Sequence, residues 1–104
     1  MLDAYEAALE RRDLAAMKRV WPGMDRTQEA GLRSDFQNAR SIDVEIVNPQ
    51  ITVKDDTATV RFLRRYDFHT VDGQRLTSQS NTTMTLQRAG SGWTITQIRY
   101  VPIR

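Results

Sequence analysis

The spacing of apolar residues changes once along this chain, near Ser41, and this change most constrains the fold. Before it, apolar residues recur every three to four positions, as on one face of a helix. After it, they alternate with polar residues, and β-branched side chains dominate, as in strands. We therefore expect an α+β fold in which N-terminal helices pack on a strongly curved antiparallel sheet. At 104 residues the chain is long enough to bury one core, which predicts a single domain over residues 1–104.

The first forty residues predict two to three helices. Asp13 is typical of an N-cap, so the first twenty residues should form two helices that meet at a bend just before it. Trp21-Pro22-Gly23 ends the second helix, because the residue before a proline leaves the α region. A third helix is expected over about residues 27–39, with Asp25 or Thr27 as its cap.

The remaining residues predict four to five strands, and keeping their apolar side chains on one face decides the turns. A two-residue turn at Asp55-Asp56 and a three-residue loop at Val71-Asp72-Gly73 both preserve one common face. The strand between these turns is so long that it must curl around the helices. A four-residue loop is expected at residues 89–92. Two irregularities are also required, a change of facing at Val47-Asn48-Pro49 and a bulge near Thr96-Gln97.

The charge pattern argues against several classes of partner. The formal net charge is only +2, with acids and bases interleaved along the predicted helices, which is not the footprint of a nucleic-acid-binding protein. No apolar run approaches the roughly 20 residues that span a bilayer, and no signal peptide follows Met1, so we expect no membrane partner. The absence of cysteine excludes disulfides but fixes no cellular compartment. The aspartates at the predicted turns lack metal-ligand spacing, so we expect no metal and no cofactor.

Several short segments together resemble a known family. They are the Tyr5…Leu9…Asp13-Leu14 run, Trp21-Pro22, Thr57-Ala58-Thr59-Val60, Leu86-Gln87-Arg88 and Gly92-Trp93-Thr94-Ile95. The chain is similar to the nuclear transport factor 2-like superfamily, the cystatin-like cone that includes SnoaL-like polyketide cyclases and ketosteroid isomerases. It particularly resembles the short versions found at the C-terminus of larger bacterial proteins, some serine/threonine kinases among them. This superfamily contains enzymes, ligand carriers and dimerisation modules, so the resemblance implies a fold and leaves the function open.

The active-site pattern of the superfamily is not expected here. Ketosteroid isomerases use an inward-facing aspartate with tyrosine donors, and the dehydratases rely on histidine and aspartate inside the cone. Asp67 and His69, the only histidine, have the opposite strand phase to Tyr66 and should point away from the helices. His69 also has no evident serine partner with which to form a nucleophile and base pair.

Arg64 is the best candidate for a ligand-binding residue. Its strand phase places it with Phe62 and Tyr66 on the face toward the helices, opposite Ser80 in the predicted register. A buried arginine needs an anionic partner, and the carboxylate or phosphate of a ligand supplies one through bidentate hydrogen bonds. The residues that we expect to line this pocket are Arg64, Tyr66, Ser78, Ser80, Trp21 and Tyr100.

Two alternatives stand beside this pocket hypothesis. In the first alternative, Arg64 lies at the open end of the cone, where it reaches water or pairs with a helix acid such as Asp35 or Glu29. The aromatic residues form either a wall for a flat ligand or part of the core that a small domain needs, and we favour core packing. They are Trp21, Phe36, Tyr5 and Tyr100.

Two functions of different classes follow. The first is a non-catalytic accessory module that forms a homodimer through the outer sheet face around Leu63, binds a small anionic or apolar ligand in the cone, or does both. The second is a small isomerase- or cyclase-type enzyme, in which Arg64 and Tyr66 polarise an anionic or carbonyl-containing substrate. We favour the first, because the acid–base pair that such chemistry requires is missing from the inward strand phase. A solvated outer face is the alternative to the dimer.

Overall fold

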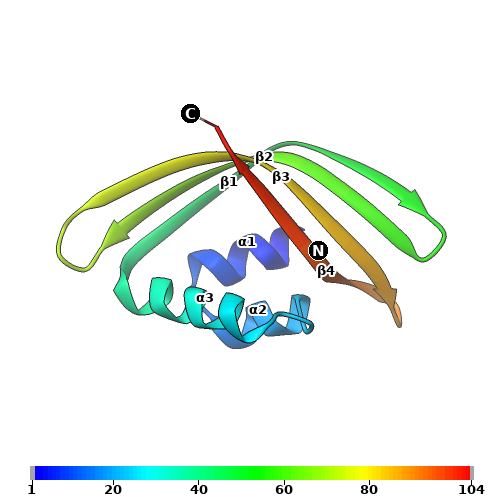
Figure 1. Ribbon diagram of the computed structural model, residues 1–104, viewed down its shortest axis with the longest axis horizontal. Coiled ribbons are helices and arrows are strands. Elements are labelled where there is room, and N and C mark those ends of the chain that lie inside the picture. The colour runs from blue at the N-terminus through cyan, green and yellow to red at the C-terminus, as the bar shows by residue number, and fades with distance from the viewer. Residues whose placement is uncertain (1, 104) are drawn as a thin grey trace.

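The computed structural model describes residues 2–103 and shows three helices beneath an arched, open, antiparallel sheet (Figure 1). The elements run in the order α1 (Leu2–Glu10), α2 (Leu14–Val20), α3 (Arg26–Asn38), β1 (Ala39–Lys54), β2 (Thr57–Thr70), β3 (Arg75–Ala89) and β4 (Gly92–Pro102). The strands lie in sequence order, β1-β2-β3-β4. The predicted α+β class is confirmed, with three helices and four strands.

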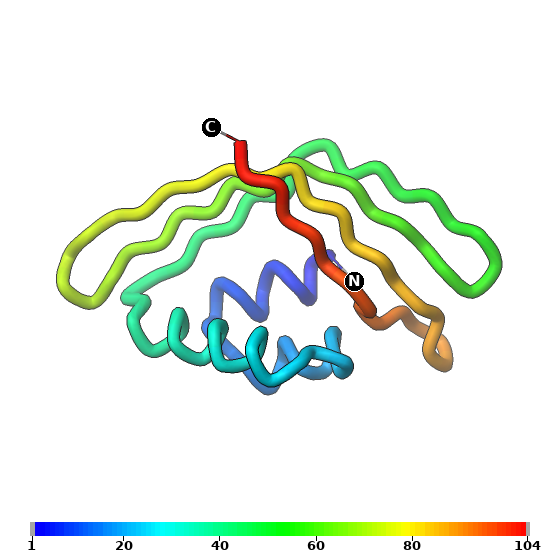
Figure 2. The backbone as a smooth tube through the Cα atoms, in the orientation of Figure 1, coloured from blue at the N-terminus to red at the C-terminus, as the bar shows by residue number. Residues whose placement is uncertain are grey.

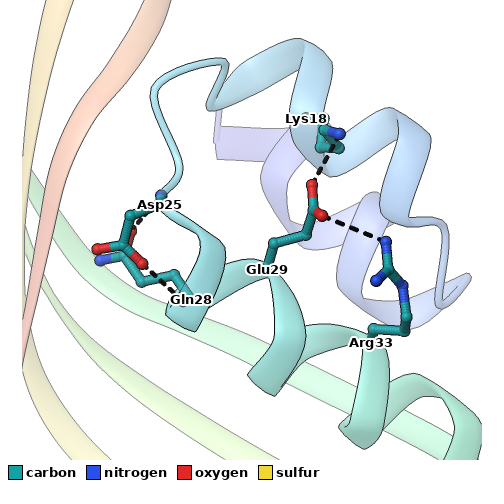
Figure 3. Close-up of polar contacts among 5 residues, drawn as sticks. All are labelled: Lys18, Asp25, Gln28, Glu29 and Arg33. Atoms are coloured by element: carbon teal, nitrogen blue, oxygen red, sulfur yellow. Dashed lines mark hydrogen bonds and ion pairs between the residues drawn. The ribbon is translucent and has the colours of Figure 1, made fainter.

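The helix boundaries follow from capping. Arg12 takes a left-handed backbone conformation with φ of 53°, and the side chain of Asp13 then accepts a hydrogen bond of 3.0 Å from the backbone N–H of Ala16. The bend predicted before Asp13 is therefore confirmed. At the start of α3, the side chain of Asp25 accepts from the N–H of Gln28, whose own side chain accepts from the N–H of Asp25 (Figure 3). This reciprocal capping box satisfies two free amide groups and sets the direction of α3.

The sheet register agrees with the predicted phase. Phe62 pairs with Thr82, and Arg64 pairs with Ser80, because the three-residue loop ends in Gly73 with φ of 93°. The change of facing in β1 occurs at Asn48, which has φ of 51° within the break between Val47 and Gln50. The bulge in β4 leaves Thr96 without a partner, since Ile95 pairs with Leu86 and Gln97 with Thr85.

The predicted four-residue loop at residues 89–92 is wrong. Ala89 pairs with Gly92, so only Gly90 and Ser91 form the turn. The physical reason is Gly90, whose φ of 60° permits the tight two-residue hairpin turn that most side chains disfavour.

The core lies between the inner face of the sheet, which faces the helices, and α1 and α2 (Figure 2). Its fully enclosed residues include Tyr5, Leu9 and Met17 from the helices and Val60, Met84 and Ile95 from the strands. By contrast, α3 has no buried residue, and its apolar side chains are only partly covered. This helix therefore closes one side of the inner space without filling it.

The two hairpin tips of β1–β2 and β2–β3 lie at opposite ends of the arch, beyond the helices (Figure 1). On the inner face of the first tip, Ile51 and Val53 are 60% and 57% exposed, although they pair with buried Val60 and Ala58 as predicted. None of the described helices has both the length and the apolar character needed to cross a membrane.

Candidate functional site

A cavity of about 370 Å³ lies between α3 and the inner face of the sheet. All three helices contribute to its wall, through Tyr5 and Leu9 of α1, Met17 of α2, and a stripe on α3. That stripe consists of Thr27, Gln28, Gly31, Leu32 and Asp35, whose spacing of one, three or four residues places them on one helical face. The cavity exists because α3 presents small and polar side chains there.

The sheet side of the cavity carries Arg64, Tyr66, Ile98 and Tyr100. Trp21, at the C-cap of α2 and only 6% exposed, closes the wall. Four of the six expected pocket residues thus come together at one cavity, namely Arg64, Tyr66, Trp21 and Tyr100. They come from the C-cap of α2, from β2 and from β4.

The two predicted serines lie elsewhere. Ser80 is buried, and its hydroxyl lies 3.2 Å from that of Thr82, so its hydrogen bond is made within β3. Ser78 is exposed beyond the end of β4, where it lines a separate depression with Arg65 and Thr77. Ser80 and Ser78 do pair with Arg64 and Tyr66, as strand phase predicted. The cavity, however, is lined by residues of β2, β4 and the helices and by none of the described residues of β3.

The guanidinium of Arg64 is held between two aromatic rings. Its central carbon lies 4.6 Å from the ring centroid of Tyr66 and 4.2 Å from that of Tyr100. Its Nη1 donates a hydrogen bond of 3.2 Å to the hydroxyl of Tyr5. These contacts are cation–π stacking and one charge-assisted hydrogen bond to a neutral hydroxyl, and neither neutralises the charge.

The charge of Arg64 has no protein counter-ion within residues 2–103. The expected alternative, pairing with Asp35 or Glu29, does not occur. Glu29 instead binds Lys18 at 2.7 Å and Arg33 at 3.2 Å, on the side of α3 that faces α2 (Figure 3). Moreover, Arg64 Nε is buried without a hydrogen-bond partner in the described part of the chain. A buried N–H without an acceptor is costly and uncommon in a native protein.

The tyrosines add further donors to the cavity. The hydroxyls of Tyr5 and Tyr100 lie 2.8 Å apart, and whichever of them donates, the other keeps a proton that finds no acceptor among residues 2–103. Burial raises the pKa of Tyr66 to about 12, and burial also raises the pKa of Tyr100. Although Tyr100 as a whole residue is 39% exposed, its hydroxyl is hydrogen-bonded to that of buried Tyr5. Both phenols therefore remain protonated at neutral pH, and the cavity has more donors than acceptors.

Asp35 is a cavity residue that strand phase did not identify. It lies on α3 and lines the cavity, and although the residue is exposed overall, partial burial raises the pKa of its carboxyl group. Its charge also contributes to the raised pKa of Tyr66, which lines the same cavity. The signal in the sequence was the helical stripe through Gly31 and Leu32, which ends at Asp35.

The outer face of the sheet holds the other candidates. Asp67 points outward as predicted and accepts two hydrogen bonds from Arg75, at 2.9 and 2.8 Å, which hold the pKa of Asp67 below its usual range. His69 does have a serine neighbour, since its Nδ1 lies 3.1 Å from the hydroxyl of Ser41. Sequence reasoning missed this contact because it spans the β1–β2 ladder. Within residues 2–103 no group of three metal-binding side chains forms at this or any other place.

Comparison with known proteins agrees with this architecture. Residues 21–101 match the family of SnoaL-like domains. No curated protein sequence matches the chain. The structure of Bd1075 from Bdellovibrio bacteriovorus superimposes with a TM-score of 0.83 and 16% identity, over 98% of this chain but only 39% of that one.

Two further structures match along most of both chains. A candidate dehydratase from the NTF2-like family of Streptomyces avermitilis has a TM-score of 0.82 and 15% identity, over 98% of this chain and 90% of that one. The CaMKII hub of S. rosetta has a TM-score of 0.74 and 19% identity, over 98% and 91%. At such identities these likenesses concern the fold alone. Together with the family match over residues 21–101, they show that the chain belongs to the SnoaL-like domain family and has the NTF2-like, cystatin-like fold.

Proposed function

We propose that this domain is a non-catalytic binding module that holds a small organic carboxylate in the cavity between α3 and the sheet. The observation that carries this proposal is the guanidinium of Arg64, which is enclosed by two tyrosine rings and lacks a counter-ion in residues 2–103. A ligand carboxylate supplies the missing negative charge. The apolar wall of Leu9, Met17 and Leu32 suits an uncharged carbon body.

The geometry of Arg64 favours a carboxylate bound side-on. Nη1 is already engaged with Tyr5, which leaves the edge formed by Nε and Nη2 without a hydrogen bond to the described residues. Two parallel N–H donors on one edge match the two oxygens of a carboxylate. Because Nε is covered, the ligand has to shift one of the flanking rings, and Tyr100 is the more exposed of the two.

Titration of the protein with small aromatic carboxylates, followed by calorimetry, tests this function. We expect binding that Arg64→Gln weakens at least about tenfold, as for loss of a charged hydrogen-bonding partner. Arg40→Gln is the matched control, since Arg40 is also a strand arginine but is exposed and makes no ion pair in the described structure. Equal affinities for the two variants and the unaltered protein would overturn the proposal.

We further propose that residues 1–104 act as one accessory domain, part of a larger bacterial protein, that forms a homodimer through the outer face. This face consists of Thr59, Arg61, Leu63, Arg65 and Asp67 of β2 and Thr83, Thr85 and Gln87 of β3. No described helix covers it (Figure 1). The support for this dimer comes from proteins of the same fold. One is named a hub and another a kinase association domain, and these names imply that those proteins self-associate.

One observation favours an enzyme as the second candidate. Asp35, with its raised pKa, faces the same cavity as Arg64 and Tyr66, so an acid–base group stands beside an oxyanion-binding group. That arrangement suits an isomerase or cyclase that moves a proton next to a carbonyl. Exchange of deuterium from solvent into a bound keto acid, lost in Asp35→Asn, is the result expected of such an enzyme. Binding without exchange would leave the module as the function.

A further inference from the structure

Asp35 is set apart from the other acid of α3 that has a shifted pKa. Glu29 is bound by both Lys18 and Arg33, so its charge is neutralised within the helix layer (Figure 3). The side chain of Asp35 makes no hydrogen bond or ion pair in the part of the chain that the structure describes, and the residue lines the cavity instead. The cavity therefore has a cation on the sheet side and an acid on the helix side, and the two do not neutralise each other.

Much of the rest of the cavity wall is apolar. Leu9, Met17, Leu32 and Ile98 line it together with the aromatic residues Trp21 and Tyr66. A cation and an acid that form no ion pair with each other, in a cavity with a largely apolar wall, suit a ligand with two polar ends and a flat or aliphatic middle. The volume of about 370 Å³ is near the small end of the usual range for ligand sites, roughly 300–1,000 Å³, so one ring with a short side chain is a reasonable size.

We infer that the ligand of this cavity is a hydroxy acid with a ring or short chain between its two polar groups, whose carboxylate binds Arg64 and whose hydroxyl donates to Asp35. This inference rests on the proposed carboxylate-binding function and adds the second polar group. Asp35 is the acceptor in this arrangement, since the tyrosines and Arg64 offer donors.

The test compares matched pairs of acids on the same protein. Benzoate, phenylacetate and 3-phenylpropionate are each paired with their 4-hydroxy derivative, so that the length varies while the added group stays the same. Dissociation constants are measured by calorimetry for the unaltered protein, Asp35→Ala and Arg64→Gln. Thermal melting of each variant shows that it is folded, and the exposed position of Asp35 makes its replacement compatible with the fold.

For at least one length, we expect the hydroxy acid to bind at least about threefold more tightly than its partner. In Asp35→Ala this ratio should fall to about one while the unsubstituted acid keeps its affinity. In Arg64→Gln the affinity for both members of the pair should fall by a similar factor. This pattern supports the inference.

Two other patterns overturn it and can be told apart. If the acids bind through Arg64 but every pair shows a ratio of about one, the carboxylate module stands and the hydroxy-acid ligand is wrong. If no acid binds in a manner that depends on Arg64, the proposed function fails and the inference fails with it. A ratio above three that persists in Asp35→Ala also overturns the inference, because another residue then accepts the hydroxyl.

Discussion

Arg64 on β2 donates a hydrogen bond of 3.2 Å to the hydroxyl of Tyr5 on α1, and this contact ties the helix layer to the middle of the sheet. Tyr5 is 1% exposed, and its hydroxyl lies 2.8 Å from that of Tyr100 on β4. Three elements thus meet at one phenol oxygen. The same oxygen orients the guanidinium, so it links the stability of the domain to the proposed binding of a carboxylate.

Replacement of Tyr5 by phenylalanine should therefore reduce both stability and binding. The substitution keeps the ring but leaves Arg64 Nη1 and the Tyr100 hydroxyl without their partner, which costs about 1–2 kcal/mol of unfolding free energy. Urea denaturation measures this loss. Tyr66→Phe is the control, because no hydrogen bond of its hydroxyl is seen in residues 2–103 and its ring still stacks on Arg64. Equal destabilisation by both variants would show that the Tyr5 hydroxyl has no special role.

Strand phase was enough to predict the place of Arg64. The register rests on Gly73 and on the break at Asn48, and both have local signals, since glycine and asparagine adopt positive φ at the least cost. Once these positions are known, alternation leaves only one face for Arg64 and Tyr66. The two serines failed as cavity residues because alternation assigns a face and does not say how far along the sheet the helices reach.

The distance between α3 and the sheet had no such local signal. It depends on how α1 and α2 pack beneath the arch, which is a property of the whole core. For this reason the sequence indicates Asp35 only as a partner of Arg64 and Tyr5 only as an aromatic residue of the core or of a ligand-facing wall, and it carries no signal at Gly31. The pattern on α3 was readable as a polar stripe, but nothing local indicated that the stripe faces a cavity.

Substitutions at Gly31 should change the stability of the domain and its affinity for carboxylates independently. It lies inside α3 and lines the cavity, and a Cβ added there meets no atom within 4 Å. Gly31→Ala should stabilise the domain by about 0.5–1 kcal/mol, because glycine is a poor helix former. Gly31→Leu should also fold, yet its side chain should occupy the cavity and abolish carboxylate binding. Denaturation and calorimetry on the two variants check this difference.

A control for Gly31 is available in the turn before α3. Gly23 also has no atom within 4 Å of an added Cβ, but it lies outside the helix and does not line the cavity. Gly23→Leu should therefore leave carboxylate affinity unchanged. Carboxylate binding at full strength in Gly31→Leu would place the ligand somewhere other than beside α3.

If the domain forms a dimer through its outer face, a single substitution on that face should lower the molecular mass of the particle in solution. Leu63 is the apolar residue of that face and is only partly buried within the protomer. Leu63→Glu should convert a dimer to a monomer in light scattering, since two like charges would meet across the interface. Val71→Glu, at an exposed hairpin tip away from this face, should leave the mass unchanged. A monomer for the unaltered protein at high micromolar concentration would refute the dimer.

The two acids of α3 should change stability in opposite directions with pH. Burial raises the pKa of Asp35 above its ordinary value of 3.8, so the folded state favours the protonated form and the ionised group opposes folding at neutral pH. The titratable and charged residues that line the same cavity are Tyr5, Arg64, Tyr66 and Tyr100. Asp35→Asn should therefore be more stable than the unaltered protein at pH 7, by less than about 1 kcal/mol because the side chain is largely exposed. As the pH falls through the folded pKa to below 3.8, this advantage should vanish, since both proteins then carry a neutral group.

Glu29→Gln is the matched comparison on the same helix. A hydrogen bond from Lys18, with the charges of Lys18 and Arg33, lowers the pKa of Glu29 below its ordinary value of 4.5. The ionised form here supports the fold, so Glu29→Gln should be less stable at pH 7, and the deficit should disappear as the pH falls through the lowered folded pKa. Unfolding midpoints of both variants, measured from pH 3 to pH 7, check the pair of signs. The same sign for both variants would mean that Asp35 is not partly buried against the cavity, and it would remove the physical basis for its role as a ligand acceptor.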